Sequence, residues 1–241
     1  MIHLDGRPIQ EKPLVTDTMD TLFDDFQNLV IDPSVWGQFV SGTGDVTTIT
    51  DNAKGSRCCA MRTGATTGSR VNIYGVDDWQ NRPGDSGGEI TGYDNTSAMA
   101  YLVMEFEALF KNRANMNNAD VILGLVPDQT YDRSSDDVCG FILNGDELAV
   151  LTDLGGSETV TAVPGTPDIE TQLNHYRIYC MQEKIVFLFN HSVVAIHTTD
   201  LANEPAYPIF LAENDTDADS GIYITNVSMG YRRYPEQNLV V

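Results

Sequence analysis

The chain has 241 residues and a mass of 26.5 kDa, and its 41% of hydrophobic residues suffices to bury a core, which excludes a disordered chain. Its 14 basic and 35 acidic residues give a formal net charge of −21, and such a surface repels phosphate backbones. We therefore expect no nucleic-acid partner. We also expect no membrane partner, because no run reaches the roughly 18 apolar residues that predict a membrane span.

The acidity comes from missing basic residues more than from added acidic ones, because charged residues make up only 20% of the chain. Only 4 lysines accompany 10 arginines, and aspartates outnumber glutamates by 24 to 11. This balance is typical of two situations. One is a protein of a halophilic host, and the other is simply the acidic surface of an extracellular or virion protein. The sequence leaves both readings open.

Residues 1–22 are polar, include Pro8 and Pro13 and follow neither the helix nor the strand period, which predicts an extended N-terminal arm. We place one domain at residues 23–233 and a C-terminal tail at 234–241. The N-terminus lacks the basic start and apolar centre of a secretory signal. We therefore expect synthesis in the cytoplasm of the host cell.

The strand period dominates the domain in chain order. In residues 101–110, Glu105 and Glu107 share one face and alternate with the apolar residues of the other. Residues 119–126 form a short apolar run. The stretch DVCGFILNGDELAVLTD then predicts two strands joined by a turn at Asn144-Gly145.

Further strands are expected at residues 175–181, 184–190, 193–199 and 221–232, with a tight reversal at His191-Ser192. No helix-period stripe exceeds two turns. Many short strands joined by turns indicate an all-β chain folded as an antiparallel β-sandwich.

The segment FDDFQNLVIDPSVWGQFVSGTG, residues 23–44, resembles the opening of concanavalin A-like lectin/glucanase (laminin-G-like) jelly rolls. The resemblance implies that Trp36 inserts between the two sheets. Residues 140–198 look like the central strands of that superfamily, and IYITNVSMGY looks like its last strand, which returns to pair beside the first. The resemblance implies a jelly roll over residues 23–233, of the kind found in structural proteins of phages and archaeal viruses.

The glucanase branch of this superfamily carries E-x-D-x-x-E on one strand, which supplies a nucleophile and an acid/base for retaining hydrolysis. Here Glu105 and Glu107 have the right spacing, but Phe110 stands at the acid/base position and Leu109 beside it. Without a proton donor the leaving sugar oxygen stays unprotonated. We therefore expect no enzymatic activity and no catalytic residue, with both glutamates on the solvated side of their strand.

Other polar patterns carry weaker predictions. Asp215, Asp217 and Asp219 alternate at positions that suit a structural calcium ion, but we favour a solvated acidic loop and keep calcium as the alternative. Ser86 lies in GDSGG, a sequence typical of serine-protease nucleophiles, but only His3 precedes it, so we treat it as a turn. No other cofactor is expected.

The remaining reactive side chains are dispersed along the sequence. Four Asn-x-Ser/Thr sequons are treated as chance, and the histidines as turn or surface residues. The cysteines Cys58, Cys59, Cys139 and Cys180 show no zinc spacing. They predict partly buried thiols, with one long-range disulfide as the alternative.

Two binding functions remain. The first is a structural protein on the surface of a virus particle, a capsid decoration, turret or fibre-associated protein. It would form a homo-oligomer through its arm and contact the major capsid or tail protein. The alternative is a lectin-like module that attaches to host glycans through four aromatic side chains: Tyr74, Trp79, Tyr93 and Tyr131.

Overall fold

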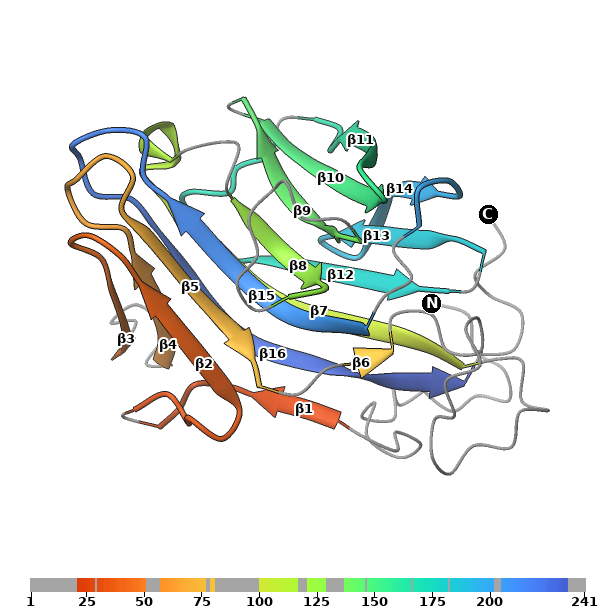
Figure 1. Ribbon diagram of the computed structural model, residues 1–241, viewed down its shortest axis with the longest axis horizontal. Coiled ribbons are helices and arrows are strands. Elements are labelled where there is room, and N and C mark those ends of the chain that lie inside the picture. Colours follow the sequence, from red (N-terminus) through yellow and green to blue (C-terminus); the bar gives the residue numbers. More distant parts are fainter. Residues whose placement is uncertain are drawn as a thin grey trace, which may run out of the picture.

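The computed structural model describes residues 21–28, 30–50, 57–76, 79–80, 100–116, 121–128, 137–145, 147–165, 167–181, 183–201 and 205–233. These residues form two antiparallel sheets that stack face to face (Figure 1). Their only helix is one 3-10 turn, η1, at Arg113–Asn115. The predicted all-β sandwich is confirmed. No helix of the described residues is long and apolar enough to cross a membrane.

Sheet A contains eight strands. Seven follow the order β14 (Ser192–His197), β13 (Ile185–Phe189), β12 (Asn174–Cys180), β7 (Ala100–Lys111), β16 (Gly221–Arg233), β4 (Arg57–Arg62) and β3 (Asp45–Thr50). The eighth, β1 (Thr21–Asp24), pairs with the second half of β16. The expected return of the last strand to the first is confirmed. The predicted boundary between arm and domain falls inside β1.

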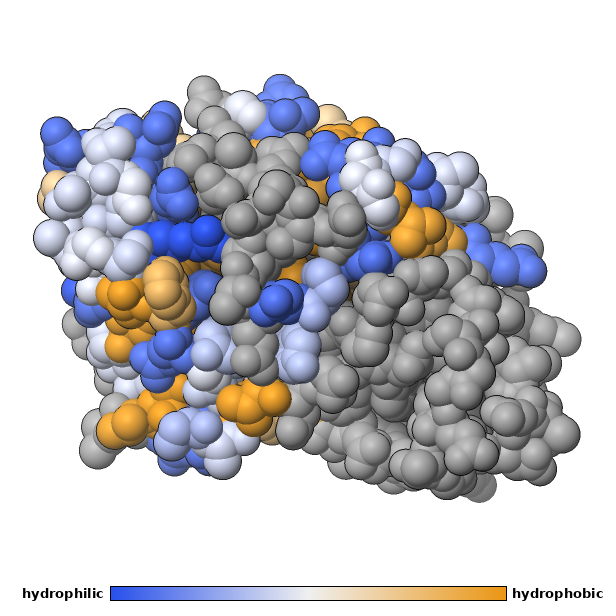
Figure 2. Space-filling view, in the orientation of Figure 1, coloured by the Kyte–Doolittle hydropathy of each residue, from blue (hydrophilic) through white to orange (hydrophobic). Residues whose placement is uncertain are grey.

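Sheet B also contains eight strands. Seven follow the order β11 (Ser157–Ala162), β10 (Glu147–Leu154), β9 (Cys139–Asn144), β8 (Ile122–Val126), β15 (Pro205–Glu213), β5 (Arg70–Gly75) and β2 (Trp36–Val40). The two-residue β6 (Trp79–Gln80) pairs with the start of β15. Figure 2 shows hydrophobic patches between hydrophilic ones on the viewed face, where β2 and β5 lie.

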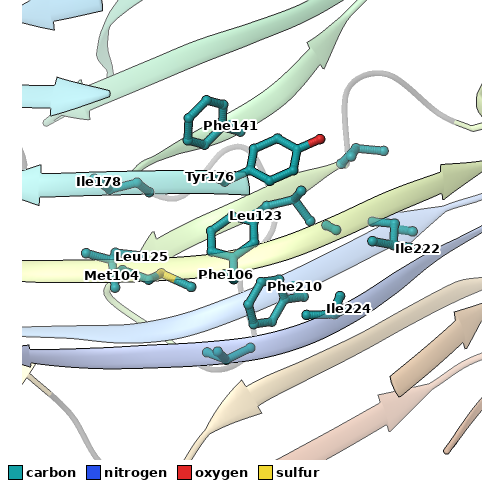
Figure 3. Packing of buried hydrophobic residues seen from close by; sticks show 14 of the residues in the cluster. Met104, Phe106, Leu123, Leu125, Phe141, Tyr176, Ile178, Phe210, Ile222 and Ile224 are labelled. Carbon is teal, nitrogen blue, oxygen red and sulfur yellow. The ribbon is translucent and has the colours of Figure 1, made fainter. Parts of the chain in front are cut away.

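The core lies between the sheets because successive side chains of a strand point to opposite faces, so the inward-facing apolar side chains of the two sheets meet. Phe106 of β7 stacks on Tyr176 of β12 with ring centroids 5.1 Å apart. It also meets Phe210 of β15 edge-on at 5.0 Å. Figure 3 shows this group with Phe141 of β9, so aromatic rings from both sheets fill the centre.

Trp36 is 1% exposed and lies between the rings of Phe26 and Phe210, at 5.9 and 6.0 Å. Its indole Nε1 donates a hydrogen bond of 2.9 Å to the Asp24 carboxylate. The predicted insertion of this tryptophan between the sheets is confirmed, and the first aspartate of FDDF anchors it.

Two predicted turns lie one residue away from their expected positions. Asn144 pairs with Glu147, so the turn lies between them, and Gly145 has the positive φ of 61° that suits glycine. Phe189 pairs with Ser192, so the other reversal is formed by Asn190 and His191, at φ 47° and 65°. Asparagine and histidine are among the non-glycine residues that most readily accept this left-handed conformation.

Candidate functional site

The outer face of sheet A, which points away from the core, gathers a polar cluster. Met104, Phe106, Ala108 and Phe110 of β7 enter the core, so the alternation directs Glu105 and Glu107 outward. The neighbouring strand β12 presents its own outward positions. Arg177 pairs with Glu105 across the strands, and His175 pairs with Glu107.

Glu105 is held by two basic side chains. Its Oε1 atom accepts hydrogen bonds from His175 Nε2 at 2.6 Å and from Arg177 Nη2 at 2.8 Å. Only 20% of the Glu105 side chain is exposed, against 14% for His175 and 17% for Arg177. Glu105 is therefore not the solvated acid that the sequence predicts. We call this set the Glu105 clamp.

Two opposing effects set the pKa of Glu105. Burial alone would raise it, but the hydrogen bonds and positive charges of His175 and Arg177 outweigh burial and lower the pKa to about 2. The carboxylate is therefore ionised at neutral pH. A buried carboxylate that already accepts two strong hydrogen bonds has little capacity to protonate a sugar oxygen.

Arg177 extends the cluster toward a further aromatic side chain. Its Nη1 donates to the Tyr179 hydroxyl at 2.9 Å, and the guanidinium lies 5.7 Å from the Tyr179 ring centre. Among the described residues, Arg177 Nε and His175 Nδ1 are buried polar atoms without a hydrogen-bond partner. Buried polar atoms without a partner are rare, so these two atoms mark the cluster as a place where a polar ligand group would gain hydrogen bonds.

Glu107 has a different partner on the other side. Its Oε2 accepts a hydrogen bond of 2.8 Å from Asn226 Nδ2 on β16. The register between β7 and β16 shifts between Thr225 and Ser228, and Asn226 has a positive φ of 52°. This bulge turns the Asn226 side chain toward the glutamate, a common use of bulges beside functional sites.

Neither the predicted acid/base position, Phe110, nor the neighbouring Leu109 carries a proton donor. Phe110 is fully buried in the core, and Leu109 shares the outward side of β7 with the two glutamates. Sheet A thus carries Glu105, Glu107 and Leu109 in succession along one face.

An apolar strip adjoins the clamp on the same sheet. Its buried members, Val103, Tyr179, Met181, Val186 and Leu188, pack together. On the edge strand β14, Val193 and Ile196 continue the strip and are exposed at 41% and 39%. The outer face of sheet A therefore combines charged donors, amide groups and apolar surface, the composition of a small-molecule binding face.

The predicted calcium residues lie at another end of the molecule. Asp217 accepts hydrogen bonds from the backbone and hydroxyl of Thr67, which lower its pKa, and Asp219 accepts one from the Gly64 backbone. In the described part of the chain, no three His, Cys, Asp or Glu side chains are grouped as metal ligands. These contacts show a second role for the aspartates, which is to hold two loops together. Calcium binding stays a prediction.

Of the four predicted glycan-contact aromatics, the structure describes the side chain of Tyr74 alone. Tyr74 lies on the outer face of sheet B, over Gly37, where a Cβ atom would come within 2.2 Å of its ring. For Trp79 the structure describes only the backbone, in β6. Tyr93 and Tyr131 lie outside the described residues, as does Ser86. Tyr74 is thus on the sheet opposite the Glu105 clamp.

Two histidines differ from the expected turn and surface positions. His197 is buried between the sheets, where its ring nitrogens contact the hydroxyls of Thr152 at 2.8 Å and Thr161 at 3.0 Å. His175 belongs to the clamp, and His191 stacks on it with ring centres 4.3 Å apart. Asn214, which begins one sequon, is 1% exposed.

The basic half of the clamp, His175 and Arg177, is not among the residues that the sequence predicts for a site. The alternation in HYRIY places His175, Arg177 and Tyr179 on one face, which is a usable signal. These side chains reach Glu105 only because β12 pairs with β7. The two strands are more than 60 residues apart in the sequence, and nothing in either strand's own sequence indicates that they pair.

The sequence matches no model of a known protein family, and no curated protein is significantly similar to it. Solved structures share the fold. An endo-1,3-β-glucanase (laminarinase) catalytic domain from Thermotoga petrophila superposes with a TM-score of 0.58 at 11% identity, covering 92% of this chain and 100% of that one. The cellulose-induced protein Cip1 gives 0.58 at 10% identity over 87% and 96% of the two chains. A Bacillus licheniformis β-glucanase gives 0.57 at 10% identity over 90% and 100%. The chain therefore shares the jelly-roll fold of these proteins.

Proposed function

We propose that the chain is a non-enzymatic jelly-roll protein that binds carbohydrate on the outer face of sheet A. The observation that carries the proposal is the Glu105 clamp. The carboxylate in the position of a nucleophile is held by Arg177 and His175, while Leu109 and Phe110 stand where a proton donor is required. Such a face keeps the polar groups that recognise hydroxyls and lacks the acid that cleaves a glycosidic bond.

The fold supports the ligand class. The structural neighbours named above include enzymes described as acting on β-glucans, so the same architecture accommodates extended sugars. On this chain Val193 and Ile196, the exposed members of the apolar strip, offer surface for sugar rings, and Arg177, His175 and Asn226 offer hydrogen-bonding groups. The buried Tyr179 positions the Arg177 guanidinium, which donates a hydrogen bond to its hydroxyl. Fold likeness alone does not transfer a function, so the ligand requires a direct test.

Binding is tested by titration calorimetry with laminari-, cello- and mixed-linkage oligosaccharides. Tyr179→Ala is expected to weaken binding at least tenfold. Tyr74→Ala is the matched control, because it removes the same ring from the opposite sheet. Loss of binding in the Tyr74 variant alone would move the site to sheet B. Absence of binding to every glycan would refute the proposal.

We propose further that the chain carries out this role as a structural protein on the surface of a virus particle. The support is the strongly acidic composition and the spaced apolar residues of the 1–22 segment, which suit contacts to a neighbouring copy in a homo-oligomer. The exposed Phe23 on β1, 65% accessible, adds apolar surface next to that segment. Mass spectrometry of purified particles would give the copy number of this chain relative to the shell protein.

Deletion of residues 1–20, which leaves β1 intact, separates the two proposals. A virion role predicts that the deletion abolishes assembly onto particles and reduces the oligomer to a monomer, measured by light scattering. Carbohydrate binding on sheet A predicts unchanged glycan affinity in the same variant. A variant that still assembles onto particles would contradict the structural role of the segment.

A further inference from the structure

Two cysteines from different sheets face each other across the core. Cys139 belongs to β9 of sheet B and Cys180 to β12 of sheet A, and both are fully buried. Their Sγ atoms are 3.8 Å apart although the residues are 41 positions apart in sequence. All four cysteines of the chain are thiols in this structure, as the sequence predicts. They are buried, whereas the sequence predicts partial burial.

The sheets are held close together at this position by a second contact. Across sheet A, Cys180 pairs with Ile185, which pairs with His197. Across sheet B, Cys139 pairs with Thr152. The hydrogen bond between His197 and Thr152, at 2.8 Å, therefore joins the same two rows of residues that carry the two thiols. It limits how far the sheets can separate at the cysteines.

We propose that Cys139 and Cys180 are a modification site, a latent disulfide that closes between the sheets when the chain meets an oxidant. A disulfide requires an S–S distance of about 2.05 Å, so the sulfur atoms must approach by roughly 2 Å, a displacement on the scale of side-chain rotation. Disulfides between the two sheets of a sandwich are an established device, as in antibody domains.

The other two cysteines do not offer an equivalent pair. Cys58 and Cys59 are neighbours on β4, so they point to opposite faces, and only Cys59 enters the core cluster. Burial, with the nearby Cys58 and Asp24, raises the pKa of the Cys59 thiol and opposes formation of its reactive thiolate.

The oxidant is a low-molecular-weight disulfide such as oxidised glutathione. One cysteine thiolate attacks it, forming a mixed disulfide and releasing one glutathione thiol. The second thiolate then attacks the protein sulfur of that mixed disulfide and releases the other glutathione. Two electrons pass from the cysteines to the glutathione disulfide, and the two cysteine protons end on the released thiols. Since both sulfurs are buried, we expect rapid closure during folding and slow closure in the folded state.

The experiment refolds the full chain either with oxidised glutathione or with dithiothreitol, followed by blocking of thiols and trypsin digestion. Trypsin cleaves after Arg133, Arg177 and Lys184, which places Cys139 in the peptide 134–177 and Cys180 in 178–184. We expect these two peptides to be linked in the oxidised sample and to separate on reduction. We also expect the melting temperature of the oxidised form to rise by about 10 °C, since the link closes a loop of about 40 residues.

Cys139→Ser and Cys180→Ser should each abolish both the link and the rise in melting temperature. Cys59→Ser, another buried core cysteine, should retain both. The comparison of oxidised with reduced wild-type protein needs no variant, so misfolding of a serine variant does not affect the test. Natively folded protein that lacks the linked peptides after oxidative refolding would overturn the proposal, as would a dominant link to Cys58 or Cys59.

Discussion

The indole nitrogen of Trp36 and the carboxylate of Asp24 are joined by a hydrogen bond of 2.9 Å that connects sheet B to the first strand of sheet A. Trp36 therefore fills the core and at the same time ties the sheets through its only polar atom. Burial of a ring with a satisfied N–H is the arrangement that buried tryptophan generally requires.

We expect Trp36→Ala to reduce the free energy of unfolding by about 3 to 5 kcal/mol, the range for truncation of a large buried aromatic side chain. Urea unfolding with an unchanged m-value would measure it. Phe39→Ala is the matched control on the same strand, because Phe39 is 49% exposed, and it should cost less than about 1 kcal/mol. Equal losses in both variants would contradict the packing role of Trp36.

No glycoside hydrolysis is expected from the wild-type chain, because neither Leu109 nor Phe110 can donate a proton. A reducing-sugar assay on β-1,3-glucan and mixed-linkage β-glucan measures this directly. The decisive contrary result would be turnover that disappears in Glu105→Gln, since it would mean that the clamp opens and that another side chain protonates the leaving group.

Glu105 should make the free energy of unfolding depend on pH in the acid range. Its pKa is lowered in the folded chain from an ordinary value of 4.5 to about 2. A carboxyl group whose pKa is lower in the folded than in the unfolded chain stabilises the fold at pH values above the unfolded pKa. This contribution is lost as the pH falls from about 4.5 to about 2. The expected contribution is about 3 kcal/mol.

The measurement for Glu105 is urea unfolding of the wild type and of Glu105→Gln between pH 2 and 6. The difference between the two proteins should shrink as the pH falls through this window. Glu147→Gln is the control, because that carboxyl is exposed and lies on β10 of the opposite sheet. A pH-independent difference between wild type and Glu105→Gln would show that the clamp is not an ion pair.

His197 should make the stability of the fold depend on pH in a higher range than Glu105 does. Burial lowers its pKa from the ordinary 6.5, and the charge of Asp200 opposes this only in part. A lowered histidine pKa means that stability is complete above 6.5 and declines as the pH falls below that value, because the buried ring resists protonation. His197→Gln should remove the decline below pH 6.5. An unchanged decline in that variant would assign it to another group.

Stability should increase with salt, because a net charge of −21 opposes compaction and dissolved ions screen it over about 8 Å. Calcium bound at Asp215, Asp217 and Asp219 would add about 2.7 kcal/mol at a hundredfold excess over its dissociation constant. Melting curves in chelator, sodium chloride and calcium chloride separate the two effects. If sodium chloride alone produces the full gain, calcium binding is excluded, and Asp217→Asn should then be indifferent to calcium.

The sequence predicts the strands and their inner faces well, because the alternation of inward and outward residues in strands such as β7 and β12 is visible in the sequence of each strand alone. Its errors follow from the absence of pairing information. Each turn shifts by one residue because several positions around Asn144 and Asn190 accept a positive φ. The bulge at Asn226 and the register that joins Arg177 to Glu105 arise only when strands distant in sequence meet.

The place of β16 in sheet A has a consequence for synthesis of the protein. This strand pairs with β7 along one side and with β4 and β1 along the other. When the ribosome has made the first 220 residues, β7 therefore lacks one neighbour and β1 lacks its only partner among the described strands. Sheet A stays incomplete until the last part of the domain leaves the ribosome. Until then the nascent chain exposes unpaired strand edges. A ribosome that stalls shortly before residue 221 would leave an aggregation-prone chain, for which early chaperone binding would matter more than rapid folding.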